Sequence, residues 1–89
     1  MIHAVLDLET LMGREDLHRR LRELLPLPAW YGNNLDALYD CLTDLQEEVQ
    51  LAILHSCLLQ ERLGAYGTAF MAVLTAAQQE NPRLQILLS

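Results

Sequence analysis

Three short apolar runs, each of strand length, constrain the fold of this 89-residue chain more than any other feature. They cover residues 2–8 (IHAVLDL), 49–55 (VQLAILH) and 84–89 (LQILLS). Helical patterns fill both intervals between them, and strands that alternate with helices predict a parallel sheet with right-handed crossovers. The predicted order is β-α-α-β-α-α-β, an α/β fold with a three-stranded parallel sheet and about four helices in one domain over residues 1–89.

Leucines at helical spacing mark the two helices of the first interval. The first helix carries a stripe of four leucines, and Pro26 and Pro28 end it; the stripe is Leu17, Leu21, Leu24 and Leu25. Asn33 or Asn34 is a good N-cap for the second helix, whose core stripe is Leu35, Leu38, Leu42 and Leu45. The second interval predicts a brief helix over 56–64 closed by Gly64 and a longer one over 66–82. We expect the helices to cover mainly one face of the sheet, with the second helix near an edge.

The second helix carries an unusual row of acids. Asp36, Asp40 and Asp44 follow one another at intervals of four residues, opposite the leucine stripe. Like charges at this spacing repel each other by roughly 0.2–0.5 kcal/mol per pair, and the dipole disfavours anions in the second half of a helix. No Arg or Lys occurs between Glu23 and Glu61 to compensate.

An acidic helix face is ordinarily a solvated surface that aids solubility. Here, however, three of the five aromatic residues of the chain accompany the acids: Trp30, Tyr31 and Tyr39. Trp and Tyr are enriched in protein interfaces, although we expect Tyr31 to pack partly into the core. The pattern therefore indicates a rigid element that presents carboxylates to a basic cavity on a partner protein.

Composition excludes several other classes of function. The formal net charge of −6 and the isoelectric point near 4.8 argue against direct nucleic-acid binding. No run of 18 apolar residues and no signal-peptide pattern occurs, so we expect a cytoplasmic protein without membrane contact. In that compartment Cys41 and Cys57 are expected to be reduced thiols inside the core.

Catalysis and metal binding find little support in the sequence. Asp36 and Asp40 would lie about 6 Å apart on a helix, which is not far from the carboxyl separation of glycosidases. A convex, solvated helix face in so small a domain, however, offers no substrate cleft. Residues 55–57 (HSC) supply only two potential metal ligands, and a strand-end histidine and a buried thiol explain them. We therefore expect no enzymatic activity, no metal and no cofactor, and a small hydrolase that uses these acids is the alternative from another class.

Residues 25–43, LPLPAWYGNNLDALYDCLT, resemble the recognition segment of the barstar family, the intracellular inhibitors of the ribonuclease barnase. The resemblance extends to chain length, to residues 16–18 (DLH) and to the final apolar strand that ends in Leu-Ser. It implies an α/β fold without enzymatic activity. It also implies a loop and second helix that plug the active-site cleft of an extracellular, guanyl-preferring ribonuclease. We expect the free protein to be a monomer.

The resemblance implies a role for individual residues as well. Asp40 would enter the phosphate-binding site of the nuclease and mimic an RNA phosphate, while Asp36 would meet another cationic group at the rim. Trp30 stands where the family has tyrosine and would stack on the catalytic histidine. The remaining contacts would come from Asn34, Tyr39, Thr43 and the backbone of Asp44.

Three departures from the family pattern alter the rim of this surface. Asp44-Leu45 replaces Gly-Trp, Ala76 and Ala77 stand where the fourth helix of the family supplies an acid, and residues 47–51 (EEVQL) lack a proline. These differences leave a second hypothesis open, in which the protein is an immunity protein or antitoxin against a different nuclease or toxin.

Overall fold

The structure is a computed structural model that describes residues 1–89, and it confirms the predicted α/β fold with its β-α-α-β-α-α-β order. Strands β1 (Ile2–Asp7), β2 (Val49–Leu54) and β3 (Leu84–Leu88) form a parallel sheet in the order β1-β2-β3. Their register aligns Ala4 with Leu51, and Leu51 with Ile86. Side chains of a strand alternate between its two faces, so these three residues share the face on which the core lies.

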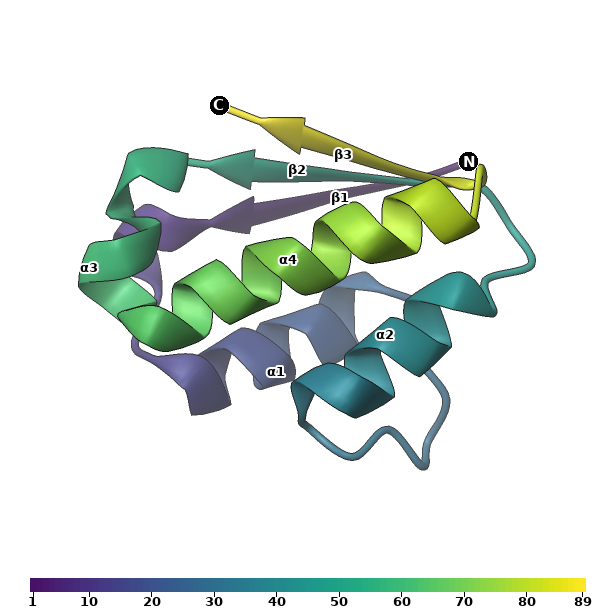
Figure 1. Cartoon of the computed structure of the whole chain (residues 1–89), viewed down its shortest axis with the longest axis horizontal. Helices are drawn as coiled ribbons and strands as arrows, with labels where there is room; N and C mark the ends of the chain where they lie inside the picture. The colour runs from purple at the N-terminus through teal and green to yellow at the C-terminus, as the bar shows by residue number, and fades with distance from the viewer.

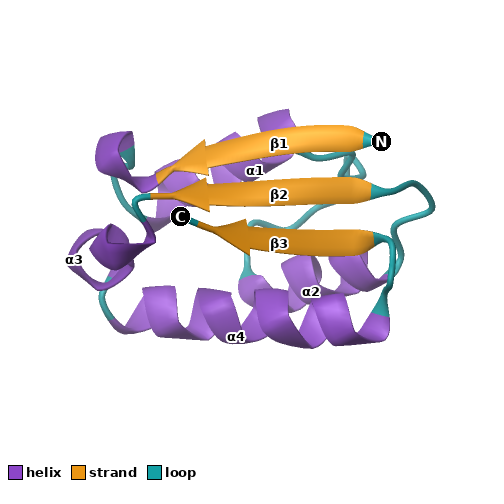
Figure 2. Ribbon diagram, turned by 90° about the horizontal axis from the view of Figure 1, so that it is seen from above, coloured by secondary structure: helices purple, strands orange, loops and turns teal.

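The four α-helices all lie on one side of the sheet, as Figure 1 shows. They are α1 (Arg14–Leu24), α2 (Leu35–Thr43), α3 (Leu59–Leu63) and α4 (Ala65–Glu80), with short 3-10 turns at Leu8–Thr10 and Ser56–Leu58. Both crossovers step across the sheet in the same direction, so crossovers of the same hand must place their helices on the same face. The opposite face of the sheet is left uncovered (Figure 2).

Helix α2 packs mainly against α4. It sits beyond the layer of α4, toward the end of the molecule where the strands begin (Figure 1). Leu38 and Leu42 of α2 belong to the same buried cluster as Phe70 and Leu74 of α4. A leucine stripe specifies that a helix face is buried but not against which element, and here the element is another helix.

A single core of 19 buried apolar residues holds the layers together. Most of these residues are leucines, and each fully buried leucine stabilises the fold by about 1.5–3 kcal/mol. Helix α1 ends at Leu24 because Leu25 precedes Pro26 and takes an extended conformation. The loop that follows then brings the chain to α2.

The two cysteines differ in burial, and the prediction that Cys57 lies inside the core is wrong. Cys41 is buried in α2, whereas Cys57 is exposed, and neither forms a disulfide. Strand β2 ends at Leu54, and His55 takes the left-handed conformation with φ of 57°. The strand alternation therefore stops before Cys57, which lies in the 3-10 turn on the outside of the molecule. No helix is both long enough and apolar enough to cross a membrane.

Candidate functional site

Three aspartates form an acidic face on the exposed side of α2. Asp36, Asp40 and Asp44 are all exposed, as the sequence predicts, and none of them takes part in an ion pair. The opposite side of the helix carries the buried side chains of Leu38 and Leu42. Helix α2 therefore presents charge on one side and is held by apolar contacts on the other.

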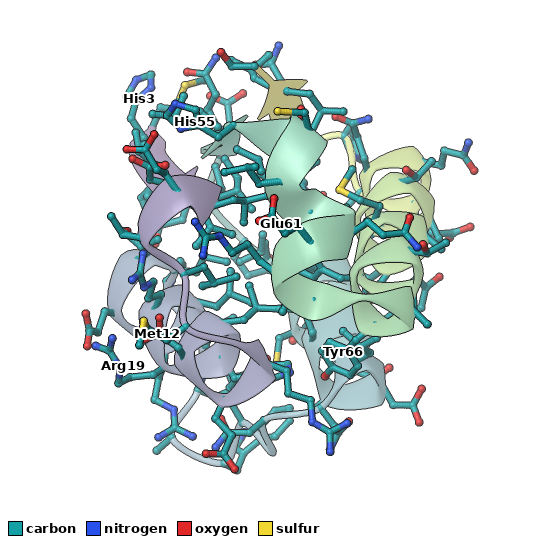
Figure 3. All side chains as sticks on the ribbon, turned by 90° about the vertical axis from the view of Figure 1, so that its left-hand side faces the viewer. His3, Met12, Arg19, His55, Glu61 and Tyr66 are labelled. Atoms are coloured by element: carbon teal, nitrogen blue, oxygen red, sulfur yellow. The ribbon has the colours of Figure 1, made fainter.

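Three arginines of α1 are engaged with groups outside the acidic face: Arg19, Arg20 and Arg22. Arg19 pairs with Asp16 and Glu23, and it projects on the side of the molecule away from α4 (Figure 3). Arg20 pairs with Asp16 at 3.0 Å, and Arg22 donates to the side chain of Asn33. These three arginines therefore form no ion pair with the acidic face, while Arg14, the fourth arginine of α1, shares the lining of a hollow with Asp36.

Asn34 fixes the beginning of α2. Its Oδ1 accepts a hydrogen bond from the backbone N–H of Ala37 at 2.8 Å, and its Nδ2 donates to the carbonyl of Gly32 at 3.2 Å. Asn33, just before it, takes the left-handed conformation with φ of 54°, which asparagine tolerates better than most residues. Of the two candidates for the N-cap, Asn34 is the residue that caps the helix. Its side chain is thus already bonded within the protein and orients the first turn.

Tyr39 and Thr43 occupy less exposed positions beside the acids. Both side chains are half-buried, and Tyr39 packs against the core. The hydroxyl of Thr43 donates to the carbonyl of Tyr39 at 3.0 Å, which leaves its oxygen free to accept a hydrogen bond from a partner. Their exposed atoms border the acidic face.

Neighbouring aromatics in the loop before α2 point in opposite directions. Trp30 is 69% exposed, whereas Tyr31 is 4% exposed and belongs to the core, as expected. Trp30 lines a hollow of about 420 Å³ together with Pro28, Asp44 and Leu45, among others. The hollow connects the exposed indole to the C-terminal end of the acidic face.

A buried histidine ties this loop to the rest of the protein. His18 is 2% exposed; its Nδ1 is hydrogen-bonded to the hydroxyl of Tyr31 and its Nε2, at 2.6 Å, to that of Tyr66. A neutral imidazole has one donor and one acceptor, so one tyrosine accepts from the ring and the other donates to it. Burial, with a smaller effect of Arg14 and Arg22, lowers the pKa of His18 and favours this neutral form.

The sequence analysis did not predict this cluster. His18 lies on the apolar side of α1, between Leu17 and Leu21, and that position was the available signal. Burial raises the pKa of both Tyr31 and Tyr66, so both hydroxyls keep their protons. The cluster therefore acts as a neutral clamp between α1, the loop and the first turn of α4, where Figure 3 shows Tyr66.

A larger hollow, of about 770 Å³, lies at the other end of the acidic face. Its lining includes Arg14, His18, Asn34, Asp36 and Tyr66. The acidic face is thus flanked by one hollow at each end of α2. No group of three or more His, Cys, Asp or Glu side chains is placed to hold a metal ion.

An anionic helix face, an exposed tryptophan and two flanking hollows are typical of a protein that binds a cationic surface of a partner protein. Comparison with known proteins agrees with that class. The family model described as Barstar (barnase inhibitor) matches residues 1–89. YrdF of Bacillus subtilis (strain 168), a candidate ribonuclease inhibitor by name, is 34% identical over 81 residues, which cover 90% of this chain and 89% of YrdF.

The chain belongs to the Barstar family, a family of ribonuclease inhibitors.

Proposed function

We propose that the protein inhibits an extracellular, guanyl-preferring ribonuclease of the barnase type by occupying its active site with α2 and the preceding loop. It would act in the cytoplasm and be a monomer when free. Family membership supports inhibition of a ribonuclease. The observation that carries the proposed mode of binding is the acidic face, because its three carboxylates are exposed and take part in no ion pair.

The mechanism follows from the charge of the two surfaces. A ribonuclease binds a polyanion, so the cleft that receives the phosphates must be cationic. Asp40, at the centre of the acidic face, would take the place of a phosphate there, and Asp36 would pair with a cation at the rim. The mutual repulsion of the aspartates in the free protein would be relieved in the complex, and the opposite charges of the partners would accelerate their encounter.

The residues around the acids supply shape and hydrogen bonds. Trp30 is exposed enough to stack on the catalytic histidine of the nuclease. Asn34 orients the first turn of α2, while Tyr39, Thr43 and the backbone of Asp44 would complete the contact. Together these residues would cover the cleft and exclude the RNA.

A titration with RNA as the substrate tests the proposal. Purified barnase serves as the probe, and one equivalent of the protein should stop cleavage of RNA. Asp40→Ala should lose tight inhibition while its circular dichroism spectrum stays unchanged, because the side chain is exposed. Full cleavage in the presence of excess wild-type protein would refute barnase-type specificity, and equal potency of Asp40→Ala would refute the mechanism.

A second candidate is an immunity protein or antitoxin against a different nuclease or toxin. The observation that favours it lies at the C-terminal end of the acidic face, where Asp44 and Leu45 line the hollow beside Trp30. At these two positions the barstar pattern has Gly-Trp. Capture of partners from the producing organism, followed by identification of the bound protein, separates the two candidates. Recovery of a toxin other than a guanyl-preferring ribonuclease, together with no effect on barnase, would favour the second.

A further inference from the structure

Asn81 joins the C-terminal end of α2 to the turn between α4 and β3. The residue follows α4 directly and is 4% exposed. Its Nδ2 donates to the carbonyl of Leu42 at 3.0 Å and to that of Leu45 at 3.3 Å, with the carbonyl of Thr43 at 3.5 Å. A single buried amide thus serves three carbonyls at and beyond the last turn of the acidic helix.

These hydrogen bonds satisfy carbonyls at the end of α2 that no basic side chain of the helix can bind. The last four carbonyls of a helix lack donors within the helix, and Lys or Arg side chains commonly bind them and complement the dipole. The last turn of α2 contains no basic residue. A cation at this end of α2 would also weaken the negative potential of the acidic face, because Asp40 lies in the same half of the helix and Asp44 at its C-cap. The uncharged amide of Asn81 satisfies the carbonyls without neutralising the acids.

Asn81 is itself held firmly from both sides. Its Oδ1 accepts from the backbone N–H of Arg83 at 3.0 Å, its backbone N–H donates to Ala77 at 2.8 Å, and its carbonyl accepts from Leu84 at 3.1 Å. The side chain therefore fixes the end of α2 relative to α4 and to β3.

We propose that Asn81 is a positioning residue that holds the C-terminal half of the acidic face, Asp40 and Asp44, in the geometry that a ribonuclease binds; this inference rests on the proposed function. Without the amide, the last turn of α2 exchanges between the conformation that the nuclease binds and frayed conformations. The apparent dissociation constant then rises in inverse proportion to the fraction of molecules in the competent position.

The key variant is Asn81→Asp, which separates the two roles of the side chain. A carboxylate keeps the acceptor for the N–H of Arg83 but loses the donor and faces the carbonyls of α2 with negative charge. Gln78→Ala is the matched control. Gln78 also links α4 to β3, since its Oε1 accepts from the N–H of Ile86 at 2.6 Å, but it makes no hydrogen bond to α2. If the aspartate variant does not fold, Asn81→Ala removes the donor without placing a negative charge against the carbonyls of α2.

The inhibition constant against barnase, computed for the folded fraction, should rise about tenfold or more in Asn81→Asp and Asn81→Ala, as expected if about a tenth of the molecules stay competent. In Gln78→Ala the inhibition constant should change less than about twofold, because Gln78 makes no hydrogen bond to α2. Amide hydrogen exchange should show lost protection at Asp44 and Leu45 in the Asn81 variants only.

A pair of double-mutant cycles adds a readout that general destabilisation would not give. Substitution of Asn81 should couple to Asp40→Ala, which lies in the half of the face that Asn81 holds, and not to Asp36→Ala at the opposite end. Unchanged inhibition by folded Asn81 variants, or equal coupling to both aspartates, would overturn the inference. Failure of the wild type to inhibit would instead overturn the proposed function and with it the binding role of Asn81. The hydrogen-exchange data would still show whether Asn81 holds the end of α2.

Discussion

Removal of the Asp40 carboxylate should stabilise the free protein. Asp40 has a like-charged neighbour four residues away on each side, Asp36 and Asp44, so Asp40→Ala relieves two repulsive pairs, about 0.4–1 kcal/mol. Alanine is also the better helix former by up to about 0.7 kcal/mol. A gain of about 1 kcal/mol raises the melting temperature of a domain of this size by about 4–8 °C.

The same substitution should weaken the complex strongly. In the bound state the cations of the nuclease would be left buried without their partner, which costs about 3–5 kcal/mol for a buried ion pair. This loss corresponds to a rise in the dissociation constant of about 100- to 5,000-fold. Stability and affinity should therefore move in opposite directions, which is the signature of a residue placed for binding rather than for folding.

Thermal unfolding followed by circular dichroism, together with an inhibition titration against barnase, measures both effects on one preparation. Asp36→Ala is the control, because Asp36 has one acidic neighbour instead of two and lies in the first turn, where the dipole favours an anion. Its melting temperature should stay close to that of the wild type. A melting temperature for Asp40→Ala below that of the wild type would show that the carboxylate makes a stabilising contact and would refute the reasoning.

Three further predictions concern the core and the charge of the surface. Since the pKa of His18 is lowered in the folded protein mainly by burial, the unfolded chain binds a proton as the pH falls below about 6.5 while the folded chain does not. Stability measured by urea unfolding should therefore decline below that pH and level off once His18 protonates in the folded state; the same slope in His18→Asn would assign the effect to other groups. Tyr66→Phe should lose about 1 kcal/mol, because it removes one hydrogen bond to His18, and an unchanged urea midpoint would contradict that bond. A thiol reagent should modify Cys57 at once but Cys41 only on unfolding, because Cys41 is buried and its pKa is raised by burial and then by Asp40 and Asp44; two rapidly reacting thiols in mass spectrometry would show that α2 opens.

Much of the fold could be predicted because its signals are local. The strands are apolar runs, the stripe with Leu38 and Leu42 specifies the buried side of α2, and Asn34 is a residue type that caps helices. The same stripe also fixes which way Asp40 points, since a helix that buries one side must expose the other. For these features the sequence pattern and the structure agree.

The remaining features depend on contacts between distant parts of the chain. His18 meets tyrosines 13 and 48 residues away, and Asn81 meets carbonyls 36 to 39 residues away. A helix followed by Asn-Pro is a stop signal in the sequence, and that pattern says nothing about the direction of the amide. The packing of α2 on α4 was missed for the same reason, because any apolar surface satisfies a leucine stripe.

The two sides of α2 share no residue, and this separation has an evolutionary consequence. Leucines hold the helix in place, whereas the aspartates that point outward contribute nothing to the core. If these aspartates bind the partner as proposed, a mutation among them would alter recognition with little effect on folding. An inhibitor built in this way can follow a changing enzyme by single substitutions, and lineages that face different enzymes can diverge at these positions while they retain one scaffold.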